Sequence, residues 1–174
     1  MPITVVANPT RLTWLNFASS PAKIVDPGDG TLVDALTQFD FDMPDLGHRM
    51  VAGQYRMADP NVITITPNAQ VFTGVLQTPA LLSHEQFHYD VGIVTARALA
   101  RELMALRAPN LAALKTAFQT ASRLHFTTRA GLLQRRYDLD TRHGTNAHFQ
   151  KIWKDRMTAC LANPSSDQLG GFFL

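Results

Sequence analysis

With 174 residues, of which 45% are hydrophobic, the chain is long enough to bury the core of one domain and too apolar to remain disordered. No apolar stretch reaches the about 20 residues that a transmembrane helix needs, so no membrane span is expected. The net charge of +2 is too small to indicate a nucleic-acid binder, and the single cysteine, Cys160, excludes a disulfide framework within the chain. Residues 1–4 carry no basic region and no long apolar run, so we expect no ordinary secretory signal.

The first part of the chain, residues 1–72, consists of short β-type runs separated by turn residues. We expect strands at residues 3–6, 12–17, 32–42, 49–57 and 62–66. Turn residues cluster at 27–30 and 58–61. Because Pro67 follows the last run, we expect that strand to end before it. This pattern favours a small antiparallel sheet.

The second part, residues 79–162, is rich in Ala, Leu and Arg with helical spacing. It predicts three helices, at about 79–106, 109–140 and 146–162. Pro79 and Pro109 suit first-turn positions, and the tail, residues 163–174, ends in three apolar residues that dock or fray. Strands followed by helices, without regular alternation, indicate one α+β domain over residues 1–174.

An H-E-x-x-H motif occupies residues 84–88, within the first predicted helix. Because four residues make about one helical turn, His84 and His88 project from the same face and can share one metal ion. Glu85 lies about a quarter-turn away, where it can act as general base toward water. Catalytic zinc takes three protein ligands and keeps one position open. The motif therefore predicts one zinc ion per chain. Further along the same helix, Gly92 is expected to leave room for another backbone to approach.

The third ligand must come from another part of the chain, and His143 is the preferred candidate. It follows the second predicted helix at the point where that helix has run back antiparallel to the first. The surrounding residues are polar, and Gly144 permits a sharp turn. Asp138 and Asp140 are rivals because carboxylates also bind zinc, and His148 ranks after them.

Three further residues have alternative interpretations. Tyr137 is predicted to donate its hydroxyl to the oxyanion of a tetrahedral intermediate, with a core tyrosine as the equal alternative. His48, in the sheet region, and His125, in the middle of a helix, are expected to be structural.

Two blocks of residues resemble a known pattern. Residues 81–91, Leu-Leu-Ser-His-Glu-Gln-Phe-His-Tyr-Asp-Val, are followed by Ala96-Arg97. The second block contains Tyr137-Asp138, Thr141, His143-Gly144, Gln150 and Trp153. In this order they resemble the H-E-Q-x-H-F-D-I, A-R and Y-D-x-x-T-x-H-G, Q-x-x-W motifs of a bacterial family of predicted zinc-dependent proteases, domain of unknown function 922. Residues 12–17 are similar to its L-T-W-x-D-F opening, with Asn16 at the usual Asp, so the resemblance covers about residues 12–153.

The resemblance implies a zincin-like fold and a metallopeptidase activity on peptide or protein substrates. It implies His84, His88 and His143 as zinc ligands and Glu85 as the base. It also implies secretion, whereas no signal is visible at residues 1–4. We expect an extended peptide to bind by strand addition at an edge strand, with residues 62–66 as the candidate.

Two other classes of function remain open. A non-catalytic zinc-binding module for structure or protein interaction would fill the fourth coordination position with Asp138, Asp140 or His148. A nucleic-acid or acidic-partner module would use four arginines, Arg129, Arg135, Arg136 and Arg142, although a solvated helix face is their ordinary explanation. We expect a peptidase, with no nucleic-acid partner.

Overall fold

One long strand, β8 (Val62–Phe72), is the centre of the main sheet in the computed structural model, which describes residues 3–43, 47–58 and 61–174. β5 (Ala35–Asp42) runs antiparallel along one edge of β8. β1 (Thr4–Ala7) and β2 (Phe17–Ser20) pair with different parts of the other edge, and both run parallel to β8. The predicted α+β class is confirmed, but the prediction of an antiparallel sheet is wrong because the sheet is mixed.

The prediction that this strand ends before Pro67 is also wrong. The carbonyl of Ile65 accepts the Asn8 N–H (2.9 Å), so Ile65 faces the β1 edge. Backbone groups alternate sides along a strand, and Pro67 therefore faces the same edge two residues later. It lies between the stretch paired with β1 and the stretch paired with β2, where no neighbouring strand needs an N–H.

Two predicted strands are each divided in two. The run at residues 32–42 forms β4 (Leu32–Val33), which pairs with β3 (Ile24–Val25), and then β5. The run at 49–57 forms a hairpin of β6 (His48–Val51) and β7 (Gln54–Met57). Its turn residues, Ala52 and Gly53, both have positive φ, as the tight turns of two-residue hairpins require. The predicted turn at 27–30 lies between β3 and β4, whereas the turn at 58–61 includes residues 59–60, which are outside the described residues.

Half of the strand predicted at residues 12–17 is instead a 3₁₀ turn, η1 (Trp14–Asn16). The Asn16 side chain accepts the Thr13 backbone N–H (2.8 Å) and so closes the turn locally. Only Phe17, which is buried, starts a strand.

The three predicted helices are confirmed to within a few residues. They are α1 (Pro79–Ala105), an uninterrupted run of α2 (Leu111–Arg123), η2 (Leu124–Arg129) and α3 (Ala130–Thr141), and finally α4 (Ala147–Ala162). The segment η2 has π-helical hydrogen bonding. The side chains of Thr78, Asn110 and Asn146 cap the first, second and last helices by accepting a backbone N–H three residues on. Pro109 therefore precedes the cap rather than occupying the first turn.

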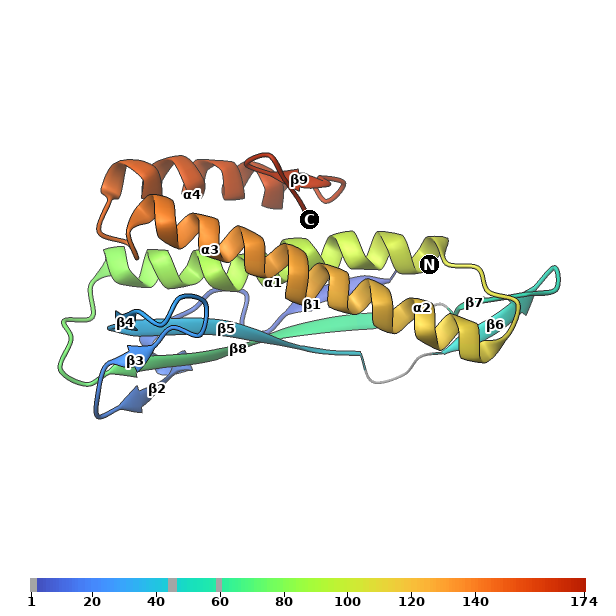
Figure 1. Ribbon diagram of the computed structural model, residues 1–174, viewed down its shortest axis with the longest axis horizontal. Helices are drawn as coiled ribbons and strands as arrows, with labels where there is room; N and C mark the ends of the chain where they lie inside the picture. The colour runs from blue at the N-terminus through green and yellow to red at the C-terminus, as the bar shows by residue number, and fades with distance from the viewer. Residues whose placement is uncertain (1–2, 44–46, 59–60) are drawn as a thin grey trace.

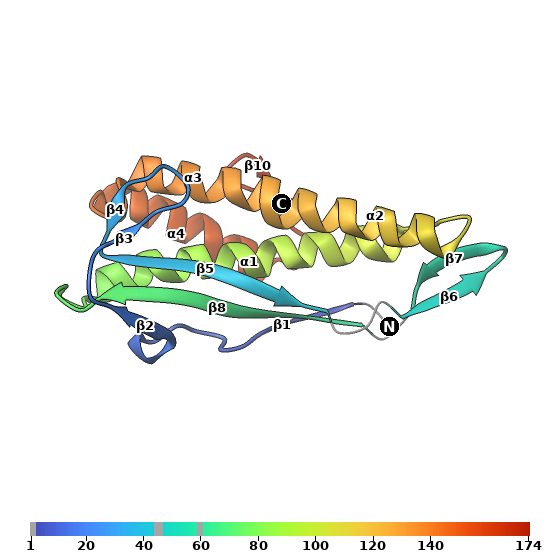
Figure 2. The same ribbon diagram turned by 60° about the horizontal axis from the view of Figure 1, so that its bottom comes forward.

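Helix α1 lies between the sheet and the other helices (Figures 1 and 2). One group of apolar side chains packs between the sheet and α1, including Ile63 and Ile65, and another packs α1 against α3 and α4. The Tyr89 hydroxyl of α1 is 2.9 Å from the carbonyl oxygen of Ile65, which ties helix to sheet. Residues 91–100 of α1 are buried on nearly all sides, and all of them except Thr95 and Arg97 are apolar or glycine. No helix in the described ranges combines the length and the apolarity needed to cross a bilayer.

Gly92 makes room for a neighbour, as predicted, but that neighbour is the ring of Phe39 on β5 rather than a backbone. A Cβ at Gly92 would lie 2.6 Å from Phe39 Cγ. The tail forms a hairpin of β9 (Gln168–Leu169) and β10 (Phe172–Phe173), and it docks because Leu169 and Leu174 are buried.

Candidate metal centre

The two histidines of the H-E-x-x-H motif lie side by side near the N-terminal end of α1. Their Nε2 atoms are 3.2 Å apart, and both residues are buried. The prediction that one helical turn brings them to the same face is confirmed. Nothing beyond the helix geometry is needed for this, because residues four apart are neighbours on any α-helix.

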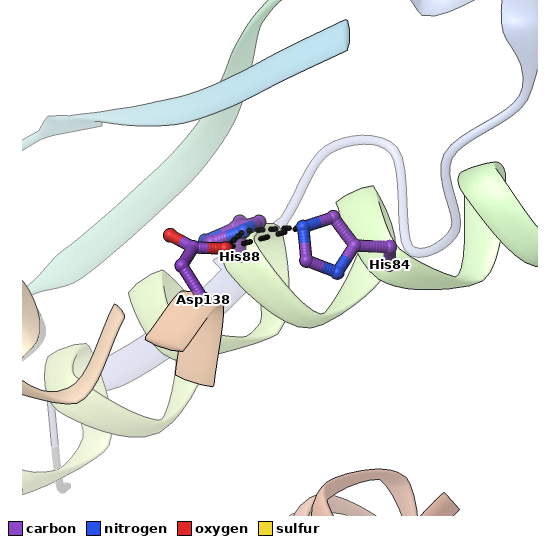
Figure 3. Close-up of side chains that lie close together, drawn as sticks. All are labelled: His84, His88 and Asp138. Atoms are coloured by element: carbon purple, nitrogen blue, oxygen red, sulfur yellow. Dashed lines mark hydrogen bonds and ion pairs between the residues drawn. The ribbon is translucent and has the colours of Figure 1, made fainter. Parts of the chain in front are cut away.

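Asp138, in the last turn of α3, places a third potential ligand atom beside the two histidines (Figure 3). Its Oδ1 is 3.0 Å from His88 Nε2 and 3.2 Å from His84 Nε2. The two imidazole nitrogens and the carboxylate oxygen form a compact triangle, and each of the three is an atom type that binds metal ions. Asp138 was a rival to His143 on the sequence, and the structure brings Asp138 to the two histidines.

His143 lies close by but is not in that triangle. Helix α3 ends at Thr141, and Arg142 and His143 both have left-handed backbone conformations (φ 50° and 49°). This turn directs His143 toward the β3–β4 hairpin, where Nε2 lies 3.2 Å from Asp29 Oδ2. Its Nδ1 is 3.9 Å from Asp138 Oδ1, and this is its ion-pair contact with the triangle.

Glu85 is 2% exposed and lines a cleft of about 590 Å³ together with His84, His88, Asp138 and His143. Its Oε2 has no hydrogen-bond partner among the residues that the structure describes. A buried carboxylate oxygen without a partner is costly, so such groups usually serve a ligand, a water or a reaction. The predicted base therefore lies beside the triangle, at the same cleft.

The charges of the three ligand residues are strongly coupled. Burial lowers the pKa of His84, and its hydrogen bond to the Asp138 carboxylate only partly opposes this. Burial also lowers the pKa of His88, but the Asp138 carboxylate outweighs it and raises this pKa to about 9. Burial alone would raise the pKa of Asp138, yet the two imidazoles hold it well below its usual range. The Asp138 carboxylate thus favours a proton on His88, and a divalent cation bound by these residues would replace that proton.

This donor set fits zinc. Two imidazole nitrogens and one carboxylate oxygen are ligand types that zinc uses in catalytic sites. With bonds of about 2.0–2.2 Å, tetrahedral ligand atoms lie about 3.3–3.6 Å apart, close to the 3.0–3.2 Å between these three atoms. The three residues would leave a fourth position toward the cleft.

Tyr137 lies beneath the triangle and does not line the cleft. It is 1% exposed, and its ring stacks on Phe87 (centroids 3.7 Å apart) and on His84 (4.8 Å). Tyr137 therefore lies in the core, which was the alternative to the oxyanion role in the sequence analysis. Its position gives the oxyanion role no support.

The other rival ligands lie elsewhere. Asp140 accepts the Trp153 indole N–H (3.0 Å) and pairs with Arg136 (3.0 Å), so it joins α3 to α4. His148 is exposed on α4, and His48 is exposed on β6. His125 is buried and bonded to Glu102 (2.7 Å), which makes it structural as expected.

Several residues of the second sequence block support the metal centre without touching the ligand atoms. Thr141 donates its hydroxyl to the Tyr137 carbonyl (2.8 Å) and so holds the end of α3. The Gln150 amide donates to the Ala80 carbonyl (3.0 Å), which joins α4 to the first turn of α1. Gly144 packs against His84.

Sequence reasoning missed the acidic residues opposite His143. Asp26 and Asp29 lie between β3 and β4. The sequence marks Asp29 only as part of the predicted turn at 27–30 and does not mark Asp26. Their contact with His143 joins segments more than a hundred positions apart, and no local pattern signals it. The four arginines proposed for nucleic-acid binding are partly engaged within the fold, since Arg129 donates to the Leu174 carbonyl and Arg136 pairs with Asp140.

We compared the chain with family models, with curated proteins and with solved structures, and none of the three comparisons found a match. The geometry of this site and the motifs in the sequence are therefore what indicate a function.

Proposed function

We propose that the protein is a zinc-dependent peptidase of the zincin-like type. The observation that carries the proposal is the buried, unpartnered carboxylate oxygen of Glu85 beside the triangle of His84, His88 and Asp138, at one cleft. A site that only held a structural metal would have no use for a free buried carboxylate at its open side.

His84, His88 and Asp138 would hold the zinc ion, with Asp138 in the place that the sequence assigned to His143. When bound, zinc would act as a Lewis acid and lower the pKa of water toward neutrality. The chain's own residues then have separate tasks. Glu85 would accept a proton from the attacking water at its free Oε2 and deliver it to the leaving amine.

The substrate would bind along β5 rather than along residues 62–66. Strand β8 is paired on both sides, so those residues offer no free edge, and the sequence-based proposal for them is withdrawn. In the described part of the sheet β5 pairs only with β8, and its residues Ala35 to Gln38 line the cleft that contains Glu85. An extended peptide added to this edge would bring a carbonyl carbon past the site.

The test begins with a calorimetric zinc titration of metal-stripped protein. We expect one-to-one binding that is strongly weakened in His84→Ala and in Asp138→Ala and retained in Glu85→Gln. A mixture of fluorogenic peptides then measures hydrolysis, which we expect Glu85→Gln to abolish. The matched control is Glu102→Gln, since Glu102 is the other glutamate of the chain and bonds to His125 instead.

Substantial hydrolysis by zinc-loaded Glu85→Gln would contradict the mechanism. Tight zinc binding with no hydrolysis of any peptide by the unaltered protein would favour the non-catalytic zinc module. A large loss of zinc affinity in His143→Ala would indicate that His143 closes the fourth position, which also favours that module.

A further inference from the structure

A second group of ligand atoms lies beside the first. Asp26, Asp138 and His143 each place one potential ligand atom within 4.8 Å of the others. Asp26 comes from the β3–β4 turn, whereas Asp138 and His143 come from the last turn of α3 and the residues after it. The group therefore joins the hairpin to the helix across the mouth of the cleft.

The atoms of this group that face one another are hydrogen-bond acceptors, an arrangement that a cation would stabilise. His143 Nε2 lies 3.2 Å from the Asp29 carboxylate, so this nitrogen donates its hydrogen to Asp29. In the neutral imidazole the other nitrogen, Nδ1, then presents a lone pair. Nδ1 faces Asp26 Oδ2 and Asp138 Oδ1, each 3.9 Å away, and both are acceptors too. Three acceptor atoms, His143 Nδ1, Asp26 Oδ2 and Asp138 Oδ1, thus converge.

The Asp29–His143 contact has the form that metal-binding histidines commonly show. A ligating imidazole usually donates its second N–H to a carboxylate, which fixes the tautomer and aims the free nitrogen at the metal. Here the aimed nitrogen is Nδ1 and the outer carboxylate is Asp29.

Asp138 has an oxygen to spare for a second ion. Its Oδ1 lies 3.2 Å from His84 Nε2 and 3.0 Å from His88 Nε2, while its other oxygen points away from His84 (Figure 3). Oδ1 also lies 3.9 Å from His143 Nδ1, so the carboxylate borders both groups, and a carboxylate can bridge two cations through its two oxygens.

We propose that Asp26, His143 and Asp138 form a second divalent-cation site that shares Asp138 with the first. Two carboxylates and one imidazole are harder donors than the first triangle, and such a set suits ions of the Mn²⁺ type. The ligand atoms are more widely spaced and more exposed than those of the first site, so the second ion binds more weakly and keeps several waters. This site goes beyond the proposed peptidase and does not require hydrolysis.

The test uses Mn²⁺, whose free aqua ion gives an electron paramagnetic resonance signal that is lost on binding. Protein loaded with one equivalent of zinc is titrated with Mn²⁺, and zinc is expected to stay bound because sites of this kind hold it more tightly than Mn²⁺. We expect one Mn²⁺ per chain in addition to the zinc. Asp26→Asn, which keeps the acceptor for the Gly28 N–H, should raise the Mn²⁺ dissociation constant by at least about tenfold.

Asp34→Asn is the matched control, because Asp34 lines the same cleft but belongs to neither ligand group. It should bind Mn²⁺ as the unaltered protein does. No stoichiometric Mn²⁺ binding, or equal binding in Asp26→Asn and the unaltered protein, would overturn the second site. Equal losses in Asp26→Asn and Asp34→Asn would also overturn it, since they indicate general attraction to an acidic surface.

A metal-stripped His84→Ala variant separates this proposal from the peptidase. The variant keeps all three ligands of the second group, so Mn²⁺ should still bind while zinc affinity is lost. Failure of zinc to bind the unaltered protein, with Mn²⁺ bound and sensitive to Asp26→Asn, would reject the proposed function and leave the second site standing.

Discussion

Gly144 packs directly against the imidazole of His84: a Cβ added to Gly144 would lie 3.1 Å from His84 Cγ and 3.2 Å from Nδ1. The loop that follows α3 is thus in contact with a proposed metal ligand on α1. The same residue has a φ of 84°, a conformation that side-chain-bearing residues avoid. Two requirements, a left-handed turn and a close approach, meet at this one glycine.

Gly144→Ala should therefore weaken zinc binding by about tenfold or more, because His84 must move to admit the methyl group. The left-handed backbone adds a strain of about 1–2 kcal/mol. Zinc titration and a urea melt measure the two effects. Gly131→Ala is the control: Gly131 is helical with open space around its Cα, and alanine there should stabilise the protein by up to about 1 kcal/mol. Unchanged zinc affinity in Gly144→Ala would show that the loop does not support His84.

Two neighbouring aspartates on α3 should behave differently. Asp138→Asn removes a charged ligand and should weaken zinc binding by more than about 100-fold, beyond what loss of an outer partner costs. Asp140→Asn should leave zinc affinity unchanged and lower stability by about 1 kcal/mol or less, because it loses mainly the half-exposed pair with Arg136. Calorimetric zinc titration of both variants shows which aspartate is the third ligand. A larger loss of zinc affinity in Asp140→Asn than in Asp138→Asn would assign that role to Asp140.

The role of Tyr137 can be separated from its packing. Tyr137→Phe keeps the ring stacked on Phe87 and His84, so zinc affinity and peptide hydrolysis should both stay within about twofold. Tyr137→Ala should destabilise the protein by about 3–5 kcal/mol through the cavity that it leaves. A hundredfold loss of turnover in Tyr137→Phe at normal stability would restore the oxyanion role predicted from the sequence.

His125 should make stability depend on pH. Burial lowers its pKa, and the hydrogen bond with Glu102 opposes this without reversing it. As pH falls through the ordinary histidine range near about 6.5, the unfolded chain takes up a proton that the folded molecule resists. The contribution of His125 is therefore present at neutral pH and is lost on acidification. Urea midpoints of the unaltered protein and His125→Gln should converge between about pH 7.5 and about pH 5.5. His148→Gln serves as an exposed control, and a difference that grows on acidification would contradict the sign.

The sequence was sufficient for those parts of the site that depend on local geometry. His84 and His88 share a face because residues four apart do so on every helix, and the helix itself follows from its cap at Thr78 and Pro79. The choice of Asp138 over His143 depends on where α3 ends. Two consecutive residues, Arg142 and His143, adopt left-handed conformations that most side chains avoid, and no pattern in the sequence signals them.

The sheet was harder to predict for a related reason. Parallel pairing of β1 and β2 with β8 joins segments about fifty positions apart, whereas turn residues report only on neighbours in the chain. Pro67 misleads because a proline ends a strand only where a neighbouring strand needs its N–H. Here Pro67 faces the gap between β1 and β2, and the sequence does not reveal that gap. The acidic pair Asp26 and Asp29 could not be placed at all, because only the fold brings it to His143.

The π-helical turn η2 lies between α2 and α3 and upstream of Asp138. A π turn accommodates one residue more than an α-helix would, so the two flanking helices keep the angular phase of a chain that is one residue shorter. Deleting the exposed Thr128 should therefore be absorbed by conversion of η2 to α-helix, with zinc affinity retained. Deleting one residue inside α3, before Asp138, should instead rotate that carboxylate by about 100° and abolish zinc binding. The segment η2 thus carries one residue whose loss should leave the orientation of the Asp138 side chain unchanged.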